Sequence, residues 1–254
     1  MDKIYTLGLC SVSFRNLSPN EIINICKSAN LNCIEWGSDL HAPYNDIEKL
    51  QNIARLQKEN SIFCSSYGTY FRLGVTPLGE LEKYITSAKI LGTNILRIWC
   101  YDKCGNDMTD KEKQDLLNVS IKASEIAKQN GVILCLECHK NSFTENLNDA
   151  LWLIKSVNSP NFKTYWQPFQ WKTVEDNLNY AKAISPYCEN IHVFNWKQTD
   201  TFNKYPLALA INEWVNYLKN FTPPKTLLLE FMPNDKVEDL IIEANALKQI
   251  VEGL

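Results

Sequence analysis

Glycine is scarce in this chain, and its scarcity excludes two kinds of site. Only nine of the 254 residues are glycine, and the chain contains neither a G-x-G-x-x-G fingerprint nor a P-loop. Both motifs need glycine so that backbone N–H groups can approach the phosphate oxygens of a nucleotide. The sequence therefore gives no support for a nucleotide site of either kind.

Long apolar runs and an excess of positive charge are also missing. No stretch approaches the ~18 consecutive apolar residues of a membrane-spanning helix. The formal net charge is −3, whereas proteins that bind nucleic-acid phosphates usually carry a basic patch. The first residues, MDKIYTLGLCSVSF, lack the basic segment and long apolar run of a signal peptide. We therefore expect neither nucleic acid nor a membrane as a partner.

Cysteine is not scarce, but its number and placement argue against a disulfide framework. The chain has nine cysteines, an odd number, and Cys10, Cys33, Cys64 and Cys135 lie in apolar segments. A free thiol in such a segment behaves as a small hydrophobe. Cys135 and Cys138 form a C-x-x-C, but in a strand this odd spacing directs the two side chains to opposite faces. Free thiols indicate a reducing compartment, so we expect a cytoplasmic protein.

Short apolar segments alternate with helical patterns along the whole chain. The apolar segments begin near Ile4, Cys33, Ile62, Asn94, Val132, Thr164, Asn190 and Thr226. Ser18-Pro19-Asn20-Glu21 has the residues of a capping box, and Gly92 and Gly131 are placed to end helices. Eight strand-then-helix units without a long linker predict an α/β fold, a single (β/α)8 TIM barrel over residues 1–254. A doubly wound sheet is the alternative, and it would need fewer strands or a glycine-rich loop.

Four of the predicted strands carry a metal-competent side chain at or near the C-terminal end. In VILCLE, KTYWQ, NIHVF and TLLLEF these side chains are Glu137, Gln167, His192 and Glu230. A carboxylate rarely ends a buried apolar run by chance, because an unpaired buried charge costs several kcal/mol or more. The C-terminal strand ends of a TIM barrel meet at the mouth that holds the active site. We predict that all four side chains converge there as ligands of a divalent ion, with Glu137 and Glu230 as the catalytic acid/base pair.

The acidic and amide residues also have structural interpretations. Glu137 and Glu230 could each pair with a nearby cation, for which Arg97 and Lys197 are the available partners. Buried carboxylates with perturbed titration cluster at functional sites, but not only there. Gln167 could equally be a hydrogen-bonding residue in a wet cleft, because a neutral amide oxygen is a weaker ligand than a carboxylate.

The histidines bear on the same choice. A single histidine in an apolar strand, such as His192, is more often a core residue that hydrogen-bonds to the backbone than a ligand. The chain has only three histidines, however, and His41, His139 and His192 all fall at predicted strand ends or in the loops after them. Imidazole together with carboxylates suits Mn²⁺, Zn²⁺, Co²⁺ or Fe²⁺, so this distribution favours a site.

Further residues at the same end of the barrel are predicted to contact a substrate. Arginine can anchor a phosphate, carboxylate or polyol oxygen, and aromatic rings can line a wall for a sugar face. The predicted substrate-binding residues are Trp36, His41, Tyr67, Arg97, His139, Gln170 and Lys197. The alternative is structural: the aromatic residues would cap the barrel core, and Arg97 would form an ion pair with Glu137 or Asp39.

With these residues in place, the chain resembles a known group, the xylose-isomerase-like TIM barrels, also called the sugar phosphate isomerase/epimerase family. The segments that carry the resemblance are NCIEWGSDLHAP, SSYGTYFRLG, ILRIW, LCLECHKNSFTEN, TYWQPFQW, IHVFNW and LLLEFM, spread over essentially the whole chain. The resemblance implies a divalent ion held by Glu, Asp, His and Glu from strands five to eight. In this chain Gln167 stands in place of the Asp, and Gln170 stands where the family often has His.

The resemblance and the residues together predict a metal-assisted isomerase or epimerase of a small sugar, sugar phosphate or keto-polyol. It would abstract a proton next to a carbonyl and pass through an enediolate, with Mn²⁺, Mg²⁺, Co²⁺ or Zn²⁺ as the cofactor. One carboxylate fewer should make that ion weakly bound. Two alternatives stay open: a keto-polyol dehydratase that uses the same site, and a catalytically silent sugar-binding barrel. The superfamily also includes an endonuclease with a histidine-rich zinc cluster, against which the three histidines and the acidic balance argue.

Overall fold

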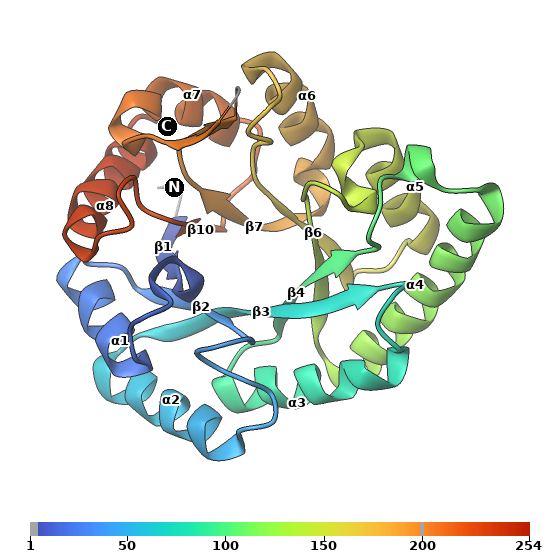
Figure 1. The fold of residues 1–254 in the computed structure, drawn as a ribbon, viewed down its shortest axis with the longest axis horizontal. Helices are drawn as coiled ribbons and strands as arrows, with labels where there is room; N and C mark the ends of the chain where they lie inside the picture. The colour runs from blue at the N-terminus through green and yellow to red at the C-terminus, as the bar shows by residue number, and fades with distance from the viewer. Residues whose placement is uncertain (1–4, 199–200) are drawn as a thin grey trace.

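Eight parallel strands close into a barrel in the computed structural model, which describes residues 5–198 and 201–254 (Figure 1). The barrel strands are β1 (Tyr5–Cys10), β2 (Cys33–Gly37), β3 (Phe63–Leu73), β4 (Ile95–Cys100), β5 (Ile133–Glu137), β6 (Phe162–Trp166), β7 (Cys188–Val193) and β10 (Lys225–Leu229). Their order around the barrel is β1-β10-β7-β6-β5-β4-β3-β2. The predicted (β/α)8 fold is therefore confirmed. The predicted first start, Ile4, lies outside the described residues.

Eight helices surround the barrel, one after each barrel strand (Figure 1). They are α1 (Pro19–Ser28), α2 (Ile47–Asn60), α3 (Leu81–Leu91), α4 (Asp110–Asn130), α5 (Leu147–Val157), α6 (Val174–Ile184), α7 (Ile211–Leu218) and α8 (Val237–Glu252). The predicted capping box is present, since Ser18 accepts from the Glu21 backbone N–H and the Glu21 carboxylate accepts from Ser18. Gly92 and Gly131 end α3 and α4 in the left-handed conformation, as predicted.

The strands divide their side chains between two separate cores. Cys10, Cys33, Cys135, Tyr165 and Leu228 belong to a small cluster within the barrel. The alternate residues of the same strands pack outward against the helices in a much larger cluster that includes Cys138. The two cysteines of the C-x-x-C thus lie in different cores, as a two-residue strand period requires. All nine cysteines are free.

A short hairpin between β7 and α7 was not predicted. Its strands are β8 (Trp196–Gln198) and β9 (Phe202–Lys204), which pair antiparallel. The backbone N–H of Gln198 donates to the carbonyl of Gln170 at 2.9 Å, so the hairpin is tied to the loop that follows β6. This contact holds an aromatic residue, Trp196, beside the C-terminal mouth of the barrel.

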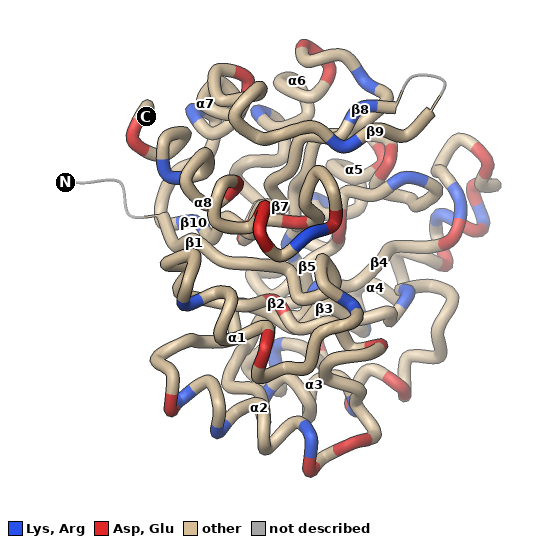
Figure 2. Tube along the Cα trace, turned by 60° about the vertical axis from the view of Figure 1, so that its left-hand side comes forward, with Lys and Arg blue, Asp and Glu red and all other residues tan. Residues whose placement is uncertain are grey.

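The outer surface shows neither a membrane-spanning element nor a face of one charge. No helix among the described residues is long and apolar enough to cross a bilayer. Figure 2 shows acidic and basic residues interspersed along the outer helices and loops.

Candidate metal centre

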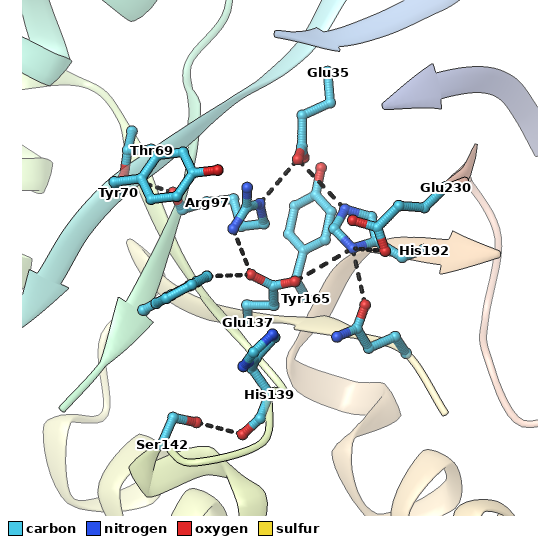
Figure 3. A network of polar contacts seen from close by, with 12 residues as sticks. Glu35, Thr69, Tyr70, Arg97, Glu137, His139, Ser142, Tyr165, His192 and Glu230 are labelled. Atoms are coloured by element: carbon cyan, nitrogen blue, oxygen red, sulfur yellow. Dashed lines mark hydrogen bonds and ion pairs between the residues drawn. The ribbon is translucent and has the colours of Figure 1, made fainter. Parts of the chain in front are cut away.

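Three of the four predicted ligands surround a ring nitrogen of the fourth, Nδ1 of His192. Gln167 Oε1 lies 3.1 Å, Glu137 Oε1 3.5 Å and Glu230 Oε2 3.6 Å from Nδ1 of His192 (Figure 3). Glu137 ends β5, His192 lies in β7, and Gln167 and Glu230 directly follow β6 and β10. Because side chains of a strand alternate, each of these residues points into the barrel, while the residue before it packs in the outer cluster, as Leu136, Trp166, Ile191 and Leu229 do.

The donor set fits a divalent ion. Ligand atoms bound at about 2.0–2.2 Å to one ion lie about 2.8–3.6 Å apart, with adjacent octahedral ligands at the short end and tetrahedral ligands at the long end of that range. The distances from His192 Nδ1 fall within that range, and one ligand atom from each of Glu137, His192 and Glu230 lies within 4.8 Å of the others. Two carboxylates, one amide oxygen and one imidazole form a mixed N/O set that suits Mn²⁺, Co²⁺, Zn²⁺ or Fe²⁺.

Glu137 is held rigidly by two donors. Its Oε2 accepts from Arg97 Nη1 and, at 2.5 Å, from Trp99 Nε1, which leaves Oε1 to face His192. Burial by itself raises the pKa of a carboxyl, but the charge of Arg97 outweighs burial and holds the pKa of Glu137 well below its ordinary value. Glu137 is therefore a fixed, ionised carboxylate.

Glu230 is in the opposite situation. Its carboxylate makes no hydrogen bond within the part of the chain that the structure describes, and Nδ1 of His192 lies 3.6 Å from its Oε2. Burial raises the pKa of Glu230, and the nearby charge of Glu137 adds to the rise against the effect of His192. Of the two carboxylates, Glu230 is the one that can take up a proton.

Glu35 is a further buried carboxylate at the site, and the sequence analysis did not select it. Its Oε1 accepts from Arg97 Nε at 2.9 Å and lies 3.4 Å from His192 Nε2, while its Oε2 accepts from Ser66 Oγ at 2.9 Å. Burial raises the pKa of Glu35, but Arg97 and then His192 outweigh burial and lower it to about 2. Glu35 could have been selected from the sequence, because it follows Cys33 by two residues and therefore lies on the same face of a buried strand.

Arg97 joins the two fixed carboxylates. It is 5% exposed and forms an ion pair with Glu137, as the structural alternative predicted, and a second one with Glu35, whereas Asp39 pairs with Arg15. Gly68 leaves room for this arrangement, since a Cβ at that position would lie 2.7 Å from Glu35 Oε1 and 2.9 Å from Arg97 Nη2. Because both carboxylates are bound to it, the guanidinium of Arg97 holds residues of the site in place and is not free to bind a substrate.

A small cavity of about 90 Å³ opens beside the ligand set. Its lining residues are Glu137, His139, Lys140, Gln167, Phe169, Gln170, Trp196, Glu230 and Phe231. Two of the predicted substrate-binding residues, His139 and Gln170, are among them. His139 stacks on Trp99 with ring centroids 4.8 Å apart, so its ring is oriented next to the carboxylate of Glu137.

The structure places two other predicted substrate-binding residues, Trp36 and Tyr67, away from the cavity. Trp36 donates from Nε1 to Gln57 of α2 at 2.6 Å, and the Tyr67 hydroxyl donates to the Ala42 carbonyl at 2.6 Å. Both side chains point outward because their neighbours Glu35 and Gly68 take the inward positions on β2 and β3. These two assignments are therefore corrected: Trp36 and Tyr67 are core residues.

His41 and Lys197 are likewise engaged elsewhere. The ring nitrogens of His41 lie 3.1 Å from Ser11 Oγ and 3.1 Å from the Leu17 carbonyl oxygen, and the side chain is 2% exposed. Lys197 forms an ion pair with Glu213 of α7 at 2.8 Å. Neither side chain lines the cavity, so substrate contact by His41 and Lys197 stays a prediction.

Comparisons with known proteins agree with this architecture. A family model described as xylose isomerase-like TIM barrel matches residues 23–226. A 3-dehydroshikimate dehydratase of Bacillus anthracis is 23% identical over 205 residues, which cover 76% of this chain and 72% of that protein. The solved structure of IOLI protein with a bound zinc atom has a TM-score of 0.79 at 16% identity and covers 97% of this chain and 98% of its own. The solved structure of L-ribulose 3-epimerase has a TM-score of 0.75 at 13% identity, and the match covers 98% of this chain and 95% of that chain. At such identities the structural likeness shows a shared fold.

Proposed function

The chain belongs to the xylose isomerase-like TIM barrel family, and we propose that it is a metal-assisted enzyme that removes a proton next to the carbonyl of a small, polyhydroxylated substrate. Within that chemistry we propose a dehydratase, which eliminates water from the β position. The observation that carries this proposal is the difference between the two carboxylates: Glu137 is bound by Arg97 and Trp99, whereas Glu230 has no hydrogen-bond donor among the described residues.

The ion would be held by Glu137, Gln167, His192 and Glu230, and when bound it would polarise the substrate carbonyl and acidify the adjacent C–H bond. Arg97 and Trp99 keep Glu137 ionised, so this side chain stays a ligand throughout. Glu230 takes the proton from the α carbon. Phe169, Trp196 and Phe231 line the cavity with apolar surface that limits access of water to the reacting carbon.

Elimination of water needs only one proton carrier. When the C–H bond breaks, its electron pair forms the enolate of the substrate. The carbonyl then re-forms, the enolate C=C pair becomes the new C=C bond between the α and β carbons, and the C–O bond at the β carbon breaks. The proton on Glu230 then passes to the departing hydroxyl, and water leaves. The carboxylate is regenerated, and no oxidant or reductant is consumed. The dehydratase activity of the Bacillus anthracis relative is consistent with this reaction class.

Epimerisation is the second candidate, and one observation favours it. Glu137 Oε1 and Glu230 Oε2 both approach His192 Nδ1, at 3.5 and 3.6 Å, so two carboxylates flank one ligand point. Inversion at a carbon requires proton removal on one face and return on the other. This role would need Glu137 to release its bonds to Arg97 and Trp99 in each cycle, which makes it the less favoured of the two.

A product assay separates these reactions. Protein stripped of metal would be supplied with Mn²⁺, Mg²⁺ or Co²⁺ and with 3-dehydroshikimate, L-ribulose, other ketoses and inosose-type polyols in deuterated water. We expect mass spectrometry to detect a product that has lost one water. An isomeric product with deuterium at one carbon would replace the dehydratase by an epimerase. If no carbonyl substrate is turned over by the metal-loaded protein, the enzymatic proposal fails in favour of a silent sugar-binding barrel.

A further inference from the structure

We propose that Glu35 is a positioning residue for the metal centre: it accepts the Nε2–H of His192 and thereby presents Nδ1 of the same ring to the ion. This inference rests on the metal centre of the proposed function but not on the identity of the substrate. Glu35 lies on β2, and its carboxylate faces Nε2 of His192, whereas the other three proposed ligands face Nδ1 (Figure 3).

The two nitrogens of His192 have different surroundings. Nδ1 faces Gln167, Glu137 and Glu230 at 3.1 to 3.6 Å. Nε2 is buried without a hydrogen-bond partner among the described residues, and Glu35 Oε1 lies 3.4 Å from it. A neutral imidazole carries one proton, so a ring that binds an ion through Nδ1 must hold its proton on Nε2. That proton needs an acceptor in a site where the ring is 0% exposed.

Glu35 is the stronger of two candidate acceptors. The other group near this nitrogen is the thiol of Cys10, which lies with Glu35 and His192 in one buried group of possible ligands. A thiol is a weak acceptor, whereas an ionised carboxylate accepts strongly. The carboxylate is therefore the group that can fix the proton of His192.

Glu35 is itself fixed on its other sides. Arg97 Nε donates to Oε1 at 2.9 Å, and Ser66 Oγ donates to Oε2 at 2.9 Å. Ser66 in turn lies 2.6 Å from the hydroxyl of Tyr165, which also accepts from Asn190 at 2.6 Å. Each oxygen of Glu35 thus has a donor that sets its position, and the carboxylate can orient the imidazole rather than follow it.

Arg97 connects this carboxylate to the ligand set. The same guanidinium binds Glu35 through Nε and Glu137 through Nη1. His192 and Glu137, two of the proposed ligands, are therefore both oriented through one buried cation. Partners of this kind around a metal site contribute about 10- to 100-fold to metal affinity.

The test is a pair of isosteric substitutions measured by metal titration. Glu35→Gln keeps an oxygen for Arg97 and an amide of the same shape, but it removes the charge that holds the Nε2 proton. We expect its Kd for Mn²⁺ and for Zn²⁺, measured by calorimetry on metal-free protein, to rise about 10- to 100-fold. Glu243→Gln is the matched control, because Glu243 is also a buried glutamate (4% exposed) but lies on α8, and we expect its Kd to be unchanged.

A second measurement includes a readout on the wild-type protein, which does not depend on how well the variant folds. The chain has only three histidines, so the ¹⁵N signals of the imidazole rings can be assigned in zinc-loaded wild-type protein. We expect His192 to show a ligated Nδ1 and a slowly exchanging proton on Nε2, and Glu35→Gln to lose that slow exchange. A zinc-ligated Nε2 in the wild type, or equal Kd values for wild type and Glu35→Gln, overturns the role of Glu35 alone. Failure of the wild type to bind either metal overturns the metal centre with it.

Discussion

At the scale of single residues, the site is defined by the unequal partners of two glutamates. Both carboxylates approach His192, but only Glu137 is bound by donors, from Arg97 and Trp99. The same type of side chain therefore has two functions, one as a fixed anion and one as a proton carrier. Substitutions at the two positions should have different consequences.

Glu230→Gln tests the role of proton carrier. The amide keeps an oxygen for the ion but cannot accept a proton from carbon, so we expect turnover to fall ~10²- to 10⁴-fold. Metal binding should weaken but persist. In Glu137→Gln, by contrast, Arg97 loses a buried anionic partner, so we expect a loss of stability of about 3–5 kcal/mol as well as weaker metal binding. Turnover, calorimetric metal binding and urea unfolding of both variants are the measurements, and near wild-type turnover of Glu230→Gln would contradict the assignment.

Gln167 stands where the resemblance of the sequence implies an aspartate ligand. Its Oε1 lies 3.1 Å from His192 Nδ1, so an aspartate there would add a charge at the ligand point. We expect Gln167→Asp to tighten Mn²⁺ binding about tenfold or more, because affinity for hard cations rises with ligand charge. Gln170→Asp is the matched control, since it adds the same charge to the cavity away from His192 and should have a smaller effect. Equal or weaker affinity in Gln167→Asp would show that this side chain is not a ligand.

Gly68 shows how closely the buried network is packed. A methyl group there would lie 2.7 Å from Glu35 and 2.9 Å from Arg97, so one of the two must move. We expect Gly68→Ala to lower the free energy of unfolding by about 1–3 kcal/mol. Gly79→Ala, where a methyl group would meet nothing within 4 Å, should be neutral or slightly stabilising. Equal stability of the two variants in urea unfolding would argue against the tight packing around Glu35.

At the scale of the elements, alternation explains what could and could not be predicted from the sequence. The barrel strands, the helix caps and the four ligands follow from local patterns, because apolar runs, caps and strand ends are local features. The substrate contacts assigned to Trp36 and Tyr67 were wrong because Glu35 and Gly68 take the inward positions beside them. The neighbouring strands of the barrel decide which face of a strand points inward. The sequence of a single strand is therefore not enough to predict that face.

The missed hairpin has a related cause. β8 and β9 have three residues each, and their position depends on a backbone bond from Gln198 to the loop after β6. Strands this short carry no recognisable period in the sequence. Without the hairpin in the prediction, the ion pair of Lys197 with Glu213 was not expected either.

A buried glutamate on α8 gives a prediction for pH. Glu243 Oε2 accepts from the backbone N–H of Leu207 at 2.9 Å, at the start of a short 3-10 helix, Leu207–Ala210. Burial, with a contribution from Asp239, raises the pKa of Glu243 to about 7. Between the ordinary glutamate pKa and about 7, the folded protein retains a proton that the unfolded chain has lost. The contribution of this group to stability therefore falls as pH rises through that window and stays low above it.

Glu243→Gln should remove this pH dependence while keeping the acceptor for Leu207. We expect the variant to gain stability relative to wild type between pH 5 and pH 8, by on the order of 2 kcal/mol. Glu125→Gln, at an exposed position on α4, should show no such change and serves as the control. Chemical unfolding at the two pH values measures the difference. A constant difference between wild type and Glu243→Gln would contradict the raised pKa.

At the scale of the whole molecule, the barrel brings together residues that are far apart in the chain. Glu35, Arg97, Glu137, Gln167, His192 and Glu230 come from six different strands or the residues directly after them. No local motif holds them together, and closure of the barrel places their side chains at one mouth. The central claim is therefore that this convergence is a metal centre.

The most direct test is an anomalous-difference map from crystals of the protein grown with Mn²⁺. The claim predicts one strong peak within bonding distance of Glu137 Oε1, Gln167 Oε1, His192 Nδ1 and Glu230 Oε2, and loss of that peak in His192→Ala. A map without a peak at this point, or with manganese bound only elsewhere on the molecule, would contradict it.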